Sequence, residues 1–119
     1  MIGFPKQTDL LIKLMDVTDM RHRVISQNLS NVNTPGYRRM KVEFDDALAK
    51  QLVDGDGFDP GLQPQIVEDT TRKARADGNT VDIDLEIGEL QRNAMMYQTY
   101  SQILASQFST MRRAVSGQS

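Results

Sequence analysis

Apolar residues recur at spacings of three and four along residues 8–32, a stretch without glycine or proline. This spacing places them on one face of an α-helix, so the sequence predicts an amphipathic helix there. Thr8 is expected to cap its first turn. The Thr34-Pro35-Gly36 run is expected to end it, because proline disfavours helical backbone in the preceding residue. The apolar face of this helix includes Leu14, Val17, Val24, Ile25 and Leu29.

The last third of the chain has the most regular pattern. Ten positions from Ile83 to Val115 are separated by alternating steps of four and three residues, and nine of them are apolar. Such a 3.5-residue period is typical of a coiled-coil seam. The pattern predicts a helix over residues 81–115, which would be about 50 Å long at the usual helical rise. The seam includes Ile87, Leu90, Tyr97, Leu104, Phe108 and Met111.

The chain between these two helices has a weaker pattern. Residues 43–53 fit a short helix whose apolar face carries Phe44, Leu48 and Leu52. Residues 54–80 are rich in glycine, proline and aspartate, which predicts a largely irregular, partly mobile segment. One short strand is expected at residues 65–68.

Two helices with a loose middle bury little surface by themselves. Ordering the backbone costs about 1–2 kcal/mol per residue, and small cores barely offset that cost. We therefore expect neighbouring molecules to cover part of both helices. The expected fold is all-α, with the two long helices in an antiparallel, coiled-coil-like pair. The single domain, residues 1–119, would comprise a helix at 8–32, a turn at 33–41, a central segment at 42–80 and a helix at 81–115.

Composition and charge narrow the functional classes. The 119 residues include no cysteine and one histidine, which disfavours thiolate zinc sites and cysteine nucleophiles. The net charge of −2 lacks the basic field that binding to nucleic acid requires. No stretch approaches the roughly 18 consecutive apolar residues of a membrane span. No apolar signal-peptide core follows residues 1–6.

Two candidate catalytic or metal sites have simpler explanations. His22 has no second histidine or cysteine to share a metal, and Ser26 one turn later lacks the glycine-shaped oxyanion turn of a hydrolase. Residues 54–59 resemble a calcium loop, but glycine falls at the fourth position instead of the sixth, which favours a solvated acidic turn.

Two charged clusters also have simpler explanations than a catalytic site or a nucleic-acid site. The carboxylates Asp82, Asp84, Glu86 and Glu89 suit the positive end of a helix, although a metal-dependent enzyme using them is an alternative. The basic run at residues 37–41 is interpreted as a protein contact, because one short patch on an acidic chain does not make a nucleic-acid site. We therefore expect no catalytic residue, metal, cofactor, nucleic acid or small-molecule substrate.

The most specific motif lies where the first helix ends. Short polar side chains at a helix exit can bond the backbone groups that a turn leaves free, and so fix the direction in which the chain continues. Pro35 and Gly36 fit the two central positions of a type II turn. The motif residues are Asn28, Asn31, Asn33, Thr34, Pro35, Gly36 and Tyr37.

This motif closely resembles the end of the N-terminal helix in bacterial flagellar basal-body rod and hook proteins. A second block, residues 77–82 leading into residues 93–98, is similar to the start of the C-terminal helix in short proximal rod subunits of that family. The resemblance covers both helices, and Ser30 stands where the family usually has alanine. It implies a non-enzymatic subunit of the rod that assembles through its terminal helices, transmits torque and forms part of the export channel.

The resemblance also implies partners and a location. The partners would be other copies of this chain, other rod proteins, the membrane-embedded basal-body ring, the rod–ring junction protein and the flagellar type III export apparatus. The location would be the periplasmic rod of the basal body, reached without a cleaved signal peptide. The alternative is a helical binding module, such as an adaptor or chaperone of a secretion system, and repeated association between identical copies would distinguish the two.

Overall fold

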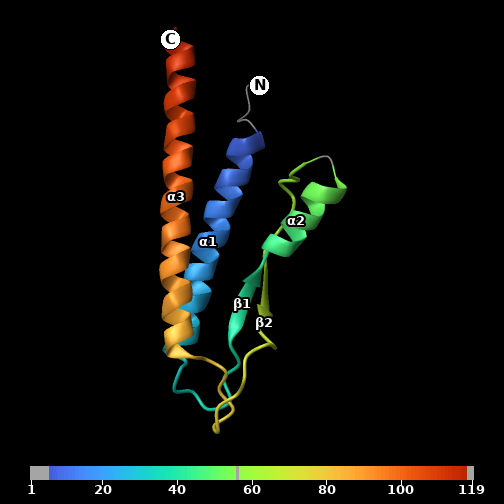
Figure 1. Ribbon diagram of the computed structural model, residues 1–119, viewed down its shortest axis with the longest axis vertical. Helices are drawn as coiled ribbons and strands as arrows, with labels where there is room; N and C mark the ends of the chain where they lie inside the picture. The colour runs from blue at the N-terminus through green and yellow to red at the C-terminus, as the bar shows by residue number, and fades with distance from the viewer. Residues whose placement is uncertain (1–5, 56, 118–119) are drawn as a thin grey trace.

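The computed structural model describes residues 6–55 and 57–117. Residues 1–5, Asp56 in the middle of the calcium-like run, and residues 118–119 lie outside this part. The molecule is elongated, with extents of 64 × 29 × 20 Å (Figure 1). Its elements, in chain order, are α1 (Lys6–Ser30), β1 (Met40–Glu43), α2 (Asp45–Asp54), β2 (Gln65–Glu68) and α3 (Ile83–Ser116).

The two long helices lie side by side and antiparallel (Figure 1). The Asp82 carboxylate caps α3 by accepting hydrogen bonds from the N–H groups of Asp84 and Leu85. Gly117 ends α3 with a φ of +75°, a conformation that favours glycine. The predicted pair of long terminal helices is therefore confirmed. The predicted cap of α1 is wrong, because α1 begins at Lys6 and Thr8 already lies inside the helix.

The middle of the chain contains more regular structure than the sequence pattern indicates. β1 and β2 form a two-stranded antiparallel sheet in which Met40 lies opposite Glu68 and Glu43 opposite Gln65. The all-α expectation is thus only approximate. The strand at 65–68 lies where it was predicted, whereas β1 falls partly in the expected turn. Four-residue strands are too short for a periodic pattern to reveal them reliably.

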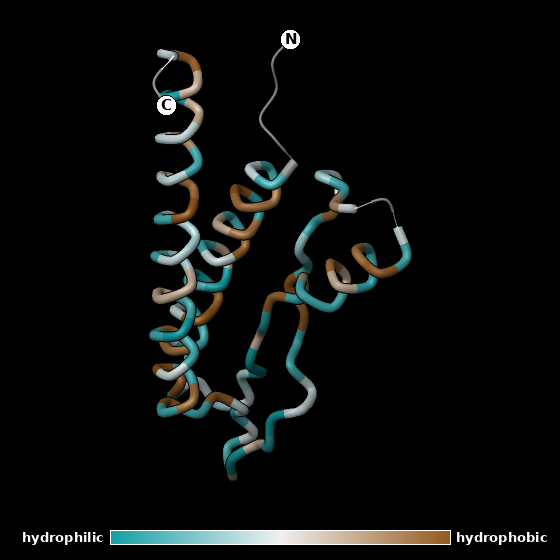
Figure 2. The backbone as a smooth tube through the Cα atoms, turned by 45° about the horizontal axis from the view of Figure 1, so that its top comes forward, coloured by the Kyte–Doolittle hydropathy of each residue, from teal (hydrophilic) through white to brown (hydrophobic). Residues whose placement is uncertain are grey.

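The hydrophobic core lies between α1 on one side and the two-stranded sheet, together with α2, on the other. Val17, Val24, Val42 and Phe44 form a buried cluster, and Leu48 packs against it. Leu52, which was expected on the same face of α2, is exposed. Hydrophobic positions recur along the whole of α3, up to its end (Figure 2).

Candidate assembly site

The lower ends of α1 and α3 meet the sheet in a cluster of buried polar side chains, here called the junction: Asn28, Arg39, Asp69, Asn79 and Glu86. Asn28, near the end of α1, holds β1 in place. Its Oδ1 accepts from the Met40 N–H at 3.0 Å, and its Nδ2 donates to the Met40 carbonyl at 2.8 Å. One asparagine thus satisfies both backbone groups of a strand residue, as a neighbouring strand would.

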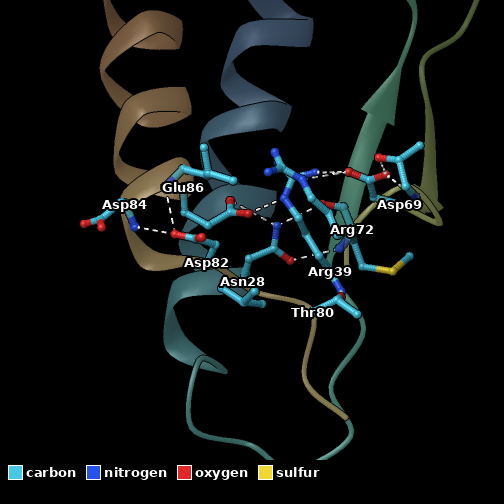
Figure 3. A network of polar contacts seen from close by, with 12 residues as sticks. Asn28, Arg39, Asp69, Arg72, Thr80, Asp82, Asp84 and Glu86 are labelled. Atoms are coloured by element: carbon cyan, nitrogen blue, oxygen red, sulfur yellow. Dashed lines mark hydrogen bonds and ion pairs between the residues drawn. The ribbon is translucent and has the colours of Figure 1, made fainter. Parts of the chain in front are cut away.

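Arg39 connects the strand to both carboxylates of the junction (Figure 3). Its Nε donates to Glu86 of α3, and its second guanidinium nitrogen donates to Asp69 Oδ2 at 2.9 Å. Arg72 adds a contact to Asp69 Oδ2 at 3.4 Å, so two cations face two carboxylates. Such balance matters because Glu86 is fully buried, and a buried charge without a partner is very costly.

Asp69 is held in its charged form by its neighbours. Burial raises the pKa of this carboxyl, but the hydroxyl and N–H of Thr71 both donate to Oδ1, at 2.6 and 3.0 Å. These bonds and the positive charges of Arg39 and Lys41 outweigh burial and lower the pKa to about 2. The ion pair between Asp69 and Arg39 therefore persists at neutral pH.

Tyr37, the last residue of the motif, points its hydroxyl into the junction. The hydroxyl donates to Asn28 Oδ1 at 3.1 Å. Burial, together with the negative charge of Glu86, raises the pKa of the Tyr37 phenol. The side chain consequently stays protonated and able to donate.

Asn79 closes the C-terminal end of α1. Its Nδ2 lies 2.8 to 3.1 Å from the carbonyl oxygens of Asn31, Val32 and Thr34, in the turn that follows α1. Its Oδ1 accepts from the Val81 N–H at 2.7 Å. One fully buried side chain thereby joins the exit of α1 to the entry of α3.

The predicted type II turn is present at the tip. Gly36 has a φ of +75°, and the Tyr37 N–H donates to the Thr34 carbonyl at 3.2 Å. The Gly36 N–H donates to the Asp77 carbonyl at 2.8 Å. A Cβ on Gly78 would meet the Gly36 Cα at 3.4 Å, so the two loops touch backbone to backbone. Both loops need glycine there, since Gly78 also has a positive φ of 84°.

The contacts between α1 and α3 above the junction are also polar. Asn93 Nδ2 donates to the Thr18 carbonyl at 2.6 Å, and the Thr8 hydroxyl donates to Gln107 Oε1 at 2.6 Å. Asn93 Oδ1 is the one buried side-chain polar atom without a hydrogen-bond partner in the described part of the chain. Glu86, Asn93 and Gln107 are separated by multiples of seven residues, with the half-buried Tyr100 between them. These four α3 residues form the polar seam.

Apolar residues of α3 are distributed in the opposite way. The buried residues of this helix, Glu86 and Asn93, are both polar. Five large apolar or aromatic residues that share one side of the helix each expose at least 42% of their surface, and they form what we call the outer face: Ile83, Ile87, Tyr97, Phe108 and Val115. Leu85, Met95 and Ile103 are exposed on other sides of α3. Such an exposed apolar surface is typical of a contact with another protein.

The arrangement offers little for catalysis or metal binding. The acidic quartet at the start of α3 is divided, because Asp82 caps the helix, Asp84 is exposed and Glu86 is bonded to Arg39. No group of residues in the described ranges could hold a metal ion. Within those ranges, no helix has the length and apolar character needed to cross a membrane. His22 is exposed on α1.

Several known proteins have sequences that are similar to this chain over most of its length. The flagellar basal body rod protein FlgB of Borreliella burgdorferi is 29% identical over 130 residues, covering 93% of this chain and 96% of the relative. FlgB of Aeromonas hydrophila is 29% identical over 98% of both chains, and FlgB of Bacillus subtilis is 27% identical over 83% of this chain. No family model matches the chain.

The chain is thus similar over most of its length to proteins that are named as rod proteins of the flagellar basal body, a structural assembly. This similarity agrees with the resemblance that the two sequence blocks indicate. Within the chain, residues that are far apart in the sequence carry the structure, and the motifs acquire defined partners.

The structure brings the predicted motif residues of this chain together at the tip. Asn28 and Tyr37 point into the junction, Asn31 and Thr34 bond each other at 3.1 Å, and Asn33 is exposed. The predicted seam residues of α1 are buried or half-buried: Leu14, Val17, Val24, Ile25 and Leu29. Those of α3 are half-buried (Leu90, Leu104 and Met111) or exposed (Ile87, Tyr97 and Phe108).

Sequence reasoning missed several of the residues that hold this chain together. Arg39 was assigned to a surface patch and Glu86 to the helix dipole, yet each is buried against the other. Asn93 was noted only as part of the second sequence block, and Gln107 was not considered. Their signal is the seven-residue recurrence with Glu86 and Tyr100, a second heptad set adjacent to the apolar one.

Proposed function

We propose that this chain is a subunit of the proximal part of the flagellar rod. It assembles through its terminal helices, transmits torque and forms part of the export channel. The observation that carries the proposal is the outer face of α3, where large apolar side chains are exposed while the polar seam faces α1. Burial of exposed apolar area drives protein association, and a regular ridge along a helix suits packing against other helices.

The junction supports a mechanical function. Asn28, Asn79 and Arg39 each bond groups from at least two segments of the chain. Any change in the angle between the helix pair and the sheet would break several of these bonds at once. A subunit with such a joint resists bending, which is what a shaft that transmits torque requires.

Partners and route follow from this function. The subunit contacts further copies of itself and other rod proteins, the basal-body ring and the rod–ring junction protein. It passes through the flagellar type III export apparatus and reaches the periplasmic rod without a cleaved signal peptide. A helical tube of such subunits leaves a central channel, through which later components are exported.

The experiment places a charge on the outer face. In cells that lack their own copy, Phe108→Asp should abolish swimming and remove the rod from purified basal bodies, because the contact with neighbours would bury the charge. Gln102→Asp is the matched control, since Gln102 is an exposed residue of the same helix and the helix propensity of the new residue is the same. This control should swim.

Two measurements separate assembly from folding. The circular dichroism melt of purified Phe108→Asp should resemble that of Gln102→Asp. Normal swimming by Phe108→Asp would refute assembly through this face, and rods that form without the chain altogether would refute the proposed function.

A further inference from the structure

Charges are segregated along this chain. Residues 40–68, here called the acidic arm, comprise β1, α2, the following loop and β2, and carry seven acidic residues and two lysines. The part of α3 beyond Glu89 carries three arginines and no acidic residue. The near-neutral net charge of the whole chain therefore conceals two regions of opposite sign.

The two regions lie on opposite flanks of the molecule. Both views show α3 on one side of α1 and the arm with α2 on the other (Figures 1 and 2). Helix α1 contacts both α3 and β1, so it separates them. Only the lower part of α3 approaches the arm, where Asp45 and Arg92 line one pocket, so the arm does not reach Arg112 and Arg113 near the C-terminal end of α3 (Figure 1).

Apolar side chains accompany the charges on both flanks. On the arm, Val53 is 83% exposed and Leu52 is also exposed, next to the acidic residue Asp54. On α3, Val115 is 90% exposed and lies close to Arg112 and Arg113, both of which are exposed. Each flank thus combines apolar surface with charge, and the charges are of opposite sign.

We propose that the acidic arm of one copy docks against the outer face of α3 of a second copy. This inference rests on the proposed function and names the surfaces through which neighbouring subunits meet. The contact joins two different surfaces, so repeating it generates a ring or a helix and never a closed pair. Complementary charges give the contact its orientation, while Val53 and the apolar residues of α3 supply buried area.

The decisive test is reversal and rescue of charge. Asp46→Lys with Asp54→Lys should abolish swimming, as should Arg112→Glu with Arg113→Glu, because each places like charges across the contact. Combining all four substitutions should restore swimming, since the charges are again opposite. Loss in each double variant without recovery in the combination would overturn the proposal, as would normal swimming in both doubles.

A matched control tests whether position matters or only net charge. Asp9→Lys with Asp16→Lys changes the net charge by the same amount as the double substitution in the arm. Asp9 lies in the first turn of α1, and Asp46 lies in the first turn of α2. Both double variants therefore lose one favourable interaction between a carboxylate and the positive end of a helix. This control should swim, and its failure to swim would contradict a contact specific to the arm.

Cross-linking identifies the occupant. The natural chain has no cysteine, so introduced cysteines are the only thiols in the protein. Val53→Cys combined in turn with Ile83→Cys, Tyr97→Cys or Val115→Cys should give dimers and higher multimers on oxidation of intact basal bodies for at least one pair. Cross-links only to a different rod protein, or none with any of the three pairs, would overturn the assignment to a second copy.

The outcomes also separate this inference from the proposed function. A wild-type chain that is absent from purified basal bodies would contradict the proposed function itself. A wild-type chain that is present, together with charge variants that assemble normally and give no cross-link, would contradict the docking of the arm alone.

Discussion

The junction and the outer face of α3 reverse the usual distribution of polar and apolar residues. In the junction, five polar or charged side chains are buried, and they hydrogen-bond across segments up to 58 residues apart. On the outer face, large apolar side chains are exposed. The adjacent residues Glu86 and Ile87 show the contrast most directly, because the charged one is fully buried and the apolar one is exposed.

This contrast indicates a division of labour between directional and non-directional forces. Hydrogen bonds and ion pairs depend on geometry, so a buried polar network specifies one arrangement of the helices and the sheet. Apolar burial is non-directional and is available for association when the side chains are left outside. A subunit can thus keep a defined shape while its apolar surface remains available for neighbours.

The strongest test of this contrast is to truncate the adjacent residues Glu86 and Ile87 to alanine and to compare the free energies of unfolding. Glu86→Ala should lower the free energy of unfolding by about 3–5 kcal/mol, because it leaves Arg39 buried with one carboxylate fewer. Ile87→Ala should change it by less than about 1 kcal/mol, since an exposed side chain loses little on truncation. Urea unfolding followed by circular dichroism measures both.

The same pair should behave in the opposite way in assembly. Ile87→Ala should weaken incorporation into the rod although the chain folds normally. Equal destabilisation by the two substitutions would show that the junction and the outer face do not differ as described.

A smaller effect is expected from acid. Asp69 has a pKa lowered from 3.8 to about 2 in the folded chain, so its contribution to stability is present above about pH 4 and is lost as the pH falls toward 2. The loss should amount to about 2 kcal/mol. Urea unfolding at a series of pH values measures it, and Asp69→Asn should flatten this part of the profile. An unchanged slope in Asp69→Asn would argue against the ionised carboxylate as its source.

The smallest expected changes in stability come from substitutions of two glycines. Gly36→Ala should destabilise the chain by about 1 kcal/mol, because alanine is strained at a φ of +75°. Gly88→Ala should stabilise it by about 1 kcal/mol, since Gly88 lies inside α3 and its added Cβ would meet open space. Thermal melts of the two variants should therefore shift in opposite directions. The Gly36→Val substitution should have a larger effect than Gly36→Ala, because the branched side chain tolerates positive φ least.

Prediction from the sequence succeeded where structure is local. The long helices and the short helix near residue 45 follow from the spacing of apolar residues, and the strand at 65–68 coincides with the adjacent apolar residues Ile66 and Val67. The turn at Pro35 and Gly36 follows from the backbone preferences of those two residues. Each of these signals is contained within a few neighbouring positions, so no knowledge of distant contacts is needed.

Prediction failed where a residue depends on a distant partner. Thr8 looked like a helix cap and instead donates to Gln107, 99 residues away. β1 was missed because a four-residue strand is recognised mainly by the strand with which it pairs. Residues 69–80 were expected to be irregular, and they do lack helix and strand, yet Asp69 and Asn79 are buried and fully bonded there.

The sequence by itself determined the two terminal helices, the turn between α1 and β1, and the apolar ridge of α3, because periodicity and turn chemistry act over short range. The tertiary structure alone decided which face of α3 meets α1, and it buries Glu86 and Asn93 of the polar seam more deeply than any residue of the apolar ridge. The reason is that burying Glu86 is tolerable only against Arg39, which lies 47 residues away in the sequence and is brought close by folding.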